Sequence, residues 1–231
     1  MKKYTHFFFD LDHTLWDFEK NSRQALEELY DDYNLKRYEI FTKEDFLATF
    51  DKVNKRLWHR YSNGHITSKK LRAERFDLIF YELKLPVRHI PRDMSEVYLL
   101  TSPKKSNVFP FTHETLDYLE QHYNLHIITN GFDDVQEIKM QSAALSKYFD
   151  KIVTSETTKH KKPQREIFEY ALEISDAKAE DSIMVGDNLK ADIIGARNAG
   201  IDQVFFNPDK NHHTESVTFE ISCLSEMQKL F

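Results

Sequence analysis

Cysteine is almost absent from this chain of 231 residues, which contains only Cys223. A single cysteine cannot form a disulfide within the chain, and it fits a protein that works in a reducing compartment. The chain also lacks an apolar run of the roughly 18 residues that a membrane-spanning helix requires. The apolar run near its N-terminus is too short for a secretory signal peptide. We therefore expect a cytoplasmic protein with no membrane partner.

No polybasic run occurs in the sequence, and acidic residues outnumber basic ones, 38 to 32. The formal net charge of −6 favours solubility and argues against a nucleic-acid polymer as partner. Glycine is scarce too, with five residues against the roughly 7% usual in globular chains, so each is expected to meet a backbone requirement. What the chain does have is 40% hydrophobic residues, which is enough for a substantial core.

The stretch from Phe7 to Leu15, FFFDLDHTL, is the most informative in the chain. Three consecutive phenylalanines predict a strand buried on both faces or a buried helical segment. Asp10 and Asp12 follow, and a spacing of two along an extended chain points both carboxylates the same way, so they should converge. Crowded carboxylates repel unless a cation lies between them. The stretch therefore predicts a metal-assisted active site at a strand end or, alternatively, an acidic turn.

Residues 16–103 show helical periodicity and no convincing strand. Thr42 and Asp45 have the spacing of a capping box, and a helix must stop before Pro86. The expected helices cover about 21–33, 42–64, 68–85 and 94–100. This segment is expected to form an all-helical insert.

From residue 107 onward, helices alternate with short apolar strands, which is typical of a parallel sheet covered by helices. The expected strands are 126–129, 151–154, 182–185, 203–206 and part of 217–221. The expected helices are 112–123, with Thr112 as its cap, 133–144, 164–174 and 189–199. Because the strand at Phe7 needs this sheet as its partner, residues 1–15 and 104–231 should form one core domain, interrupted by a helical domain at 16–103. The predicted fold class is α/β, a doubly wound, Rossmann-like parallel sheet with an inserted α-helical bundle.

Polar residues mark three further strand ends. Thr129-Asn130-Gly131 suits an anion site or a simple turn. Lys162-Pro163 is predicted at the first turn of a helix, suited to an anion, although a solvated basic surface explains it equally well. Gly186-Asp187, followed by Asp192, suits a hard-cation site, or else Asp187 caps a helix.

The four strand ends together resemble the haloacid dehalogenase superfamily, whose four motifs stand here as DLDHT at 10–14, Thr129, Lys162 and GDNLKAD at 186–192. The motifs occur in the order of the family, and the resemblance covers essentially the whole chain. It implies a doubly wound core and a helical cap inserted after the first motif. Lys159 and Phe111 depart from the pattern, because the family commonly has glycine at both places.

The resemblance implies phosphoryl transfer through an aspartyl-phosphate on Asp10. Asp12 would protonate the leaving oxygen and later deprotonate the hydrolytic water. Mg²⁺ would be bound by Asp10, Asp187 and the Asp12 carbonyl and would neutralise the repulsion between nucleophile and phosphate. Lys162 would be catalytic together with the two aspartates, and Asp192 would orient Lys162 or metal-bound water. The residues implied to bind the phosphate are Asp10, Leu11, Asp12, Thr129, Asn130 and Lys162.

Asp12 favours a phosphatase, since the dehalogenases of the family lack an aspartate at this position. The cap also resembles that of bacterial pyrimidine 5′-nucleotidases at Asn54, Leu57, Trp58, Tyr61, Gly64, Ile66, Leu71, Arg75 and Phe76. Most of these residues are equally well explained as bundle core. The substrate-selecting side chains would be Trp16, Phe18, Trp58 and Arg75.

We therefore expect a Mg²⁺-dependent phosphomonoesterase, a monomer or weak homodimer, that acts on a small soluble phosphate such as a nucleoside 5′-monophosphate. The alternatives are a phosphatase of sugar or other metabolite phosphates, a phosphomutase, a non-catalytic regulatory protein and a dehalogenase of the same fold.

Overall fold

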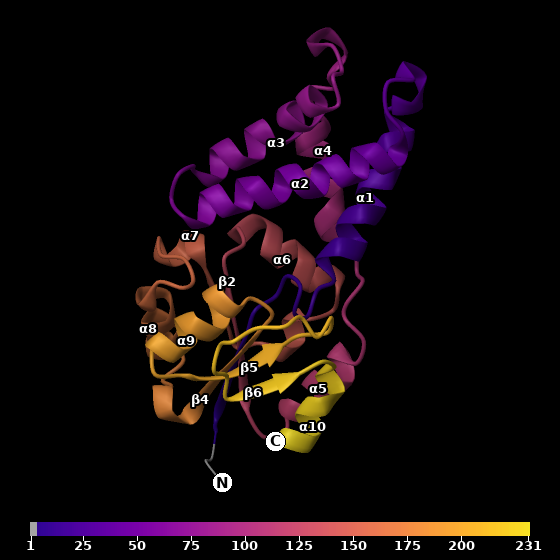
Figure 1. Ribbon diagram of the computed structural model, residues 1–231. Coiled ribbons are helices and arrows are strands. Elements are labelled where there is room, and N and C mark those ends of the chain that lie inside the picture. Colours follow the sequence, from indigo (N-terminus) through magenta and orange to yellow (C-terminus); the bar gives the residue numbers. More distant parts are fainter. Residues whose placement is uncertain (1–3) are drawn as a thin grey trace. The chain divides into compact units, whose positions relative to one another are not determined.

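A computed structural model describes residues 4–231 and divides them into two compact units (Figure 1). The core unit comprises the chain up to Phe18 together with Ser106–Phe231, and the helical unit comprises Glu19–Lys105. The sequence places the first boundary after residue 15, whereas Trp16 and Phe18 belong to the core unit. The physical reason is that the outgoing and returning chains pair: Trp16 forms a bridge with Val108, and the Phe109 amide donates to the Leu15 carbonyl at 2.9 Å.

Within the described residues, the core unit contains a six-stranded parallel sheet in the order β3-β2-β1-β4-β5-β6. Its strands are β1 (His6–Phe9), β2 (Asn124–Thr129), β3 (Lys151–Thr154), β4 (Ser182–Gly186), β5 (Asp202–Phe206) and β6 (Phe219–Ile221). The chain order reverses at β1, which pairs with β2 on one side and β4 on the other. In such sheets the carboxyl ends of the strands at this switch point are the usual ligand site.

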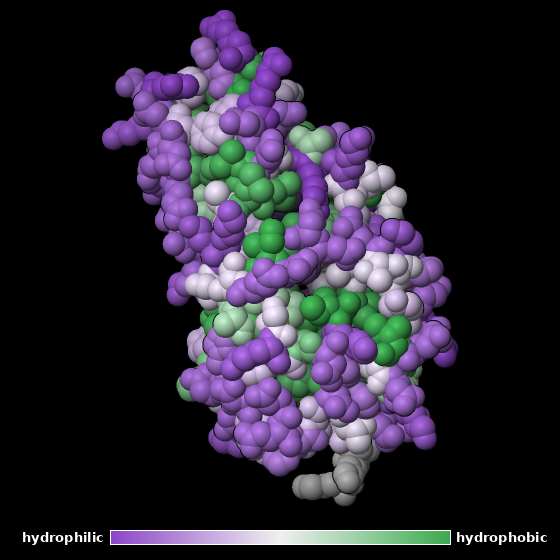
Figure 2. Space-filling view, turned by 180° about the vertical axis from the view of Figure 1, so that it is seen from behind, coloured by the Kyte–Doolittle hydropathy of each residue, from purple (hydrophilic) through white to green (hydrophobic). Residues whose placement is uncertain are grey.

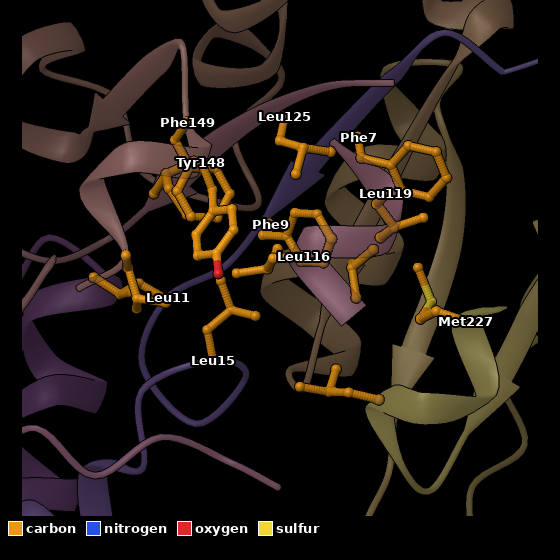
Figure 3. Packing of buried hydrophobic residues seen from close by; sticks show 14 of the residues in the cluster. Phe7, Phe9, Leu11, Leu15, Leu116, Leu119, Leu125, Tyr148, Phe149 and Met227 are labelled. Carbon is orange, nitrogen blue, oxygen red and sulfur yellow. The ribbon is translucent and has the colours of Figure 1, made fainter. Parts of the chain in front are cut away.

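The three phenylalanines of β1 explain why this strand lies at the centre of the sheet. Phe7 and Phe9 point into one hydrophobic cluster, part of which is shown in Figure 3, and Phe8 points into the other. Successive side chains of a strand alternate between faces, so an uninterrupted apolar run requires a sheet covered on both faces. The predicted strand buried on both faces is therefore present.

The two faces are covered by different helices. One cluster receives side chains from α5 (Thr112–Leu119), α6 (Asp133–Ser142) and α10 (Met227–Leu230). The other receives side chains from α8 (Arg165–Ile174) and α9 (Gly195–Asn198). The predicted helix 189–199 is divided, because Leu189–Ile194 is π-helical and only then does α9 follow.

Short helical segments complete the core unit. They are α7 (Ser155–Thr158) and the 3₁₀ segments Ser146–Tyr148, Ala179–Asp181 and Leu224–Glu226.

The helical unit contains α1 (Phe18–Asp32, beginning at the boundary), α2 (Lys43–Ser62), α3 (Ser68–Glu82) and α4 (Met94–Thr101), with 3₁₀ segments Leu35–Tyr38, Val87–His89 and Ser102–Lys104. The predicted capping box is confirmed, since the Asp45 amide donates to Thr42 Oγ1 at 3.1 Å and the Thr42 amide to Asp45 Oδ2 at 2.9 Å. Aromatic side chains join α2 to α3, with ring centroids of Phe46 and Phe80 5.9 Å apart.

Phe111 and Lys159, which stand where the resembled family commonly has glycine, both adopt left-handed backbone conformations, with φ of 65° and 62°. This conformation is uncommon for residues with a side chain, which explains why glycine suits these loops. Phe111 is also the N-cap of α5, so the expectation that Thr112 caps this helix is wrong. Thr112 is its first residue, and its hydroxyl donates to the Phe109 carbonyl at 2.8 Å.

No helix in residues 4–231 combines the length and apolar character that a membrane span requires. Figure 2 shows one face of the molecule, on which hydrophilic side chains predominate and hydrophobic ones gather in separate patches. This distribution agrees with a chain in which 30% of the residues are charged.

Candidate active site

The residues predicted for catalysis, phosphate binding and metal binding lie within the core unit, most of them at the carboxyl edge of the sheet. Asp10 follows β1 directly, Thr129 ends β2, and Asp187 follows β4. The Asp10 amide donates to the Val185 carbonyl at 2.9 Å, which keeps the two strands together one residue beyond β1. Because neighbouring parallel strands end at the same edge, these groups come together although they are distant in sequence.

Lys162 is buried between two carboxylates. Its Nζ lies 2.8 Å from Asp10 Oδ1 and 2.7 Å from Asp192 Oδ1, and it donates to the Ile128 carbonyl at 2.6 Å. An ammonium group has three hydrogens, so this arrangement uses all of them. Burial alone would lower the pKa of Lys162, but the two carboxylates outweigh it and raise the pKa. Lys162 is therefore a fixed positive charge beside Asp10.

The loop that carries Lys162 is attached to the end of β2. The side-chain amide of Asn130 donates to the Lys162 carbonyl at 3.0 Å, and the Lys162 amide donates to Asn130 Oδ1 at 2.8 Å. The Lys162-Pro163 peptide bond is cis. Gln164 is the N-cap of α8, so the expectation that Pro163 lies in the first turn of this helix is wrong. Lys162 is therefore oriented by hydrogen bonds between its own backbone and the Asn130 side chain, and not by a helix N-terminus.

Three carboxylates form a cluster suited to a hard cation. Asp10, Asp187 and Asp192 each offer an oxygen, and these oxygens all lie within 4.8 Å of one another. Thr14 Oγ1 donates to Asp187 Oδ1 at 3.1 Å. Burial raises the pKa of Asp10 and of Asp187 to about 6. Repulsion from Asp192 adds to the effect at Asp10, and repulsion from Asp10 adds to it at Asp187. Carboxylates that repel one another and resist ionisation are suited to a divalent cation. Its positive charge would offset both the repulsion and the cost of burying the ionised groups.

Asp192 is completely buried, and its place depends on Gly186. Asp192 Oδ2 accepts a hydrogen bond from the Asn188 amide at 3.0 Å. A Cβ atom at Gly186 would lie only 2.4 Å from Asp192 Oδ2, so a side chain there would displace the carboxylate from Lys162. Glycine is required here for the close approach of Asp192. Asp187 is not a helix cap, because Asn188 is the N-cap of the helical segment that follows.

The Asp12 carboxylate has partners of its own. Lys139 Nζ lies 2.6 Å from Asp12 Oδ1, and Gln136 Nε2 donates to Asp12 Oδ2 at 3.0 Å. Burial acts to raise the pKa of Asp12, but the Lys139 charge and the two hydrogen bonds outweigh it, so the pKa is lowered. The charge of Asp12 also acts on Asp10, where repulsion adds to burial in raising the pKa.

Two backbone amides and one hydroxyl remain available to a phosphate. Among the described residues, none accepts a hydrogen bond from the amides of Leu11 and Asp12. Thr129 Oγ1 accepts hydrogen bonds from the Gly131 amide at 3.1 Å and from Gln136 Nε2 at 2.8 Å. Since a hydroxyl oxygen has two lone pairs, its own hydrogen is free to be donated.

Sequence reasoning missed Gln136 and Lys139. They are three residues apart on α6, a spacing that places them on one helix face, but nothing in the sequence indicated that this face turns toward Asp12. Trp16, expected to select substrate, is completely buried instead, and its ring lies 4.5 Å from Lys139 Nζ; Phe18 lies 5.9 Å from it.

The other two expected substrate-selecting residues lie in the helical unit. The Trp58 ring contacts that of Tyr61, with centroids 5.5 Å apart. The Arg75 guanidinium is buried over the rings of Phe50 and Tyr98, at 5.8 and 5.4 Å from their centroids. Burial lowers its pKa, and the part of the chain that the structure describes provides no carboxylate partner for it.

Comparison with known proteins identifies the family. Residues 7–206 match the model of the haloacid dehalogenase-like hydrolases. Pyrimidine 5′-nucleotidase YjjG of Escherichia coli is 32% identical, over 99% of this chain and 98% of the relative. Pyrimidine 5′-nucleotidase PynA of Streptococcus pneumoniae is 29% identical, over 94% and 91%. The magnesium-bound crystal structure of YfnB from Bacillus subtilis, 29% identical, superposes with a TM-score of 0.88 and covers 99% of each chain.

Proposed function

The chain belongs to the haloacid dehalogenase-like hydrolases, and we propose that it is a Mg²⁺-dependent phosphatase of pyrimidine nucleoside 5′-monophosphates. The observation that carries the proposal is the position of Asp10, a carboxylate at a strand end that pairs with the buried Lys162 ammonium and lies in one cluster with the Asp187 and Asp192 carboxylates. The substrate class is inferred from two pyrimidine 5′-nucleotidases, YjjG and PynA, to which nearly the whole chain is similar.

In the first step an Asp10 oxygen forms a bond to phosphorus while the bond from phosphorus to the ester oxygen breaks. The leaving oxygen takes a proton from Asp12, whose position two residues after the nucleophile suits this role. Lys162, Thr129 and the amides of Leu11 and Asp12 would donate to the phosphoryl oxygens as negative charge spreads over them. The product of this step is an aspartyl-phosphate on Asp10.

In the second step water attacks phosphorus, the bond to Asp10 breaks, and Asp12 accepts the proton of the water. The lowered pKa of Asp12 keeps its carboxylate ionised, so that it has a site free to accept this proton. A metal ion would be held by Asp10, Asp187 and the Asp12 carbonyl, with Asp192 beside them. Bound there, Mg²⁺ supplies positive charge that offsets the repulsion between a carboxylate nucleophile and a phosphate dianion.

Substrate selection would fall to the helical unit. The Arg75 guanidinium carries the strongest indication, because a buried charge without a carboxylate partner is costly and so suggests a binding role. Trp58 adds an aromatic surface on which a base could stack. Trp16 and Phe18 would act indirectly, through Lys139, which they contact.

A panel of phosphate esters tests the function. We expect Mg²⁺-dependent release of phosphate, with kcat/KM highest for pyrimidine nucleoside 5′-monophosphates and lower for purine nucleotides and sugar phosphates. Replacing Arg75 by lysine should lower kcat/KM for the preferred nucleotide by about 10-fold, the effect of one hydrogen bond to a charged group, and leave p-nitrophenyl phosphate unaffected. The matched control is Arg56→Lys, at an exposed arginine paired with Glu82.

Halide release from haloacids, or phosphate transfer to an acceptor other than water, would contradict the proposed reaction. Metal binding without turnover of any ester would indicate a regulatory protein instead. Equal kcat/KM values of the wild type for all esters, with no further change in either arginine variant, would contradict the proposed substrate class but not the phosphatase reaction.

We also propose that the protein is cytoplasmic and acts as a monomer or weak homodimer. The half-buried Cys223 forms no disulfide, which fits a reducing compartment. Light scattering on the purified protein measures the oligomeric state.

Metal binding is expected to depend on pH. The pKa values of Asp10 and Asp187, about 6, lie above their ordinary value of 3.8, so the folded state binds more protons than the unfolded state between these values. Stability of the metal-free protein should therefore fall as pH rises through this window. Mg²⁺ must displace these protons at low pH, so its stabilising effect should grow as pH rises past about 6.

The measurement is Tm with and without Mg²⁺ at about pH 5 and about pH 7.5. Asp187→Asn should lose most of the Mg²⁺-induced increase at the higher pH. An increase of the same size at both pH values would contradict the assignment of these carboxylates as metal ligands.

A further inference from the structure

Helix α6 contributes two buried side chains that contact Asp12 and belong to none of the four motifs. Lys139 Nζ and Gln136 Nε2 approach the two different oxygens of the Asp12 carboxylate, at 2.6 and 3.0 Å. We propose that Lys139 and Gln136 are positioning residues, which orient Asp12 for proton transfer and Thr129 for binding the phosphoryl group. The inference rests on the proposed phosphatase function and names the side chains on which its acid–base step depends.

The position of Lys139 is itself well defined. Its Nζ lies 4.5 Å from the Trp16 ring centroid and 5.9 Å from that of Phe18, and its side chain is 7% exposed. A cation is attracted to the face of an aromatic ring, and a buried ammonium cannot leave its carboxylate partner without a large desolvation cost. Lys139 therefore restricts the orientation of Asp12.

Gln136 joins the proton-transfer group to a phosphate-binding group. Its amide nitrogen donates one hydrogen to Asp12 Oδ2 and the other to Thr129 Oγ1, at 3.0 and 2.8 Å. Only the nitrogen can face a carboxylate oxygen, so the orientation of the amide is determined. A Cβ atom at Gly131 would lie 2.2 Å from Gln136 Nε2, so this glycine permits the approach of Gln136.

This arrangement serves both steps of the reaction. When one oxygen of Asp12 carries the proton, its other oxygen can still accept a hydrogen bond. Asp12 therefore keeps a contact with Lys139 or Gln136 in its protonated form. In the first step that proton passes to the leaving oxygen as its bond to phosphorus breaks. A misplacement of about 1 Å at this point can cost roughly 10²-fold in rate.

The leaving group distinguishes positioning from a merely structural role. The alkoxide of a nucleoside 5′-monophosphate needs a proton in order to leave, whereas p-nitrophenolate leaves without one. Lys139→Met keeps an apolar chain on Trp16 but removes the charge. We expect it to lower kcat/KM by about 10²-fold for the nucleotide but only by about 10-fold for p-nitrophenyl phosphate. Asp12→Asn should show the same dependence on the leaving group.

Three further variants complete the experiment. Lys139→Arg keeps the charge and should restore most of the nucleotide activity. Gln136→Met should weaken inhibition by vanadate, a phosphate mimic, because Thr129 loses its support. Lys147→Met is the matched control, since Lys147 also pairs with an aspartate, Asp117, and lies 4.4 Å from the Tyr148 ring centroid, but it is exposed. It should change neither activity.

Equal losses on both substrates in Lys139→Met, or no loss on either, would overturn the inference while leaving the phosphatase function intact. Lack of activity in the wild type on both substrates would overturn the proposed function and the inference with it. Melting curves for each variant show whether the protein assayed is folded.

Discussion

Asp10→Asn is expected to abolish phosphatase activity, with a loss in kcat on the order of 10⁴-fold to 10⁶-fold, as when other enzymes lose a nucleophile. Asparagine has nearly the same shape as aspartate but cannot form the acyl-phosphate. The fold should tolerate the change, because it removes one of the repelling carboxylates in the cluster with Asp187 and Asp192.

The decisive measurement is transfer of radioactive phosphate from labelled substrate to protein quenched in acid. Label should remain on the wild type and be absent from Asp10→Asn. Unchanged or higher Tm in the variant shows that the loss is chemical. Retained turnover, or label on the variant, would reject Asp10 as nucleophile.

Lys162→Met is expected to lower both activity and stability. The buried ammonium separates Asp10 from Asp192, and its removal leaves two buried carboxylates without their counter-charge. Removing one partner of a buried ion pair typically costs about 3–5 kcal/mol in the free energy of unfolding. Activity should fall as well, since Lys162 would donate to the phosphoryl oxygens.

The loss of stability should shrink at low pH. Without Lys162, the pKa values of Asp10 and Asp192 rise further above their ordinary range, so both groups take up protons more readily as the pH falls. At about pH 5, below the folded-state pKa of Asp10 of about 6, less buried negative charge remains to be neutralised. Urea unfolding of wild type, Lys162→Met and the control Lys147→Met at low and neutral pH measures this. A deficit that is equal at both pH values would mean that Lys162 contributes by packing and not by charge.

Much of the local structure could be predicted because it depends on neighbours in the sequence. The Thr42–Asp45 capping box joins residues three positions apart, and β3 was predicted with its observed bounds. The predicted α/β class, with a doubly wound parallel sheet, is confirmed by the strand order and by the similarity to the YfnB structure. Errors occurred where tertiary contacts override local preference, as at the cap of α5 and in the π-helical segment after β4.

By itself the sequence determined which chemical groups the core offers: Asp10 and Asp12 after the phenylalanine run, Thr129, Lys162, Asp187 and Asp192. Lys162, predicted at a strand end, lies instead in the loop between α7 and α8. Only the tertiary structure decided which groups meet. Lys139 and Asp12 are 127 residues apart, and their contact depends on β2 lying beside β1 and on which face of α6 turns inward. Residue spacing is a short-range property and specifies neither of these, so the partners of the two aspartates become visible only in the assembled sheet.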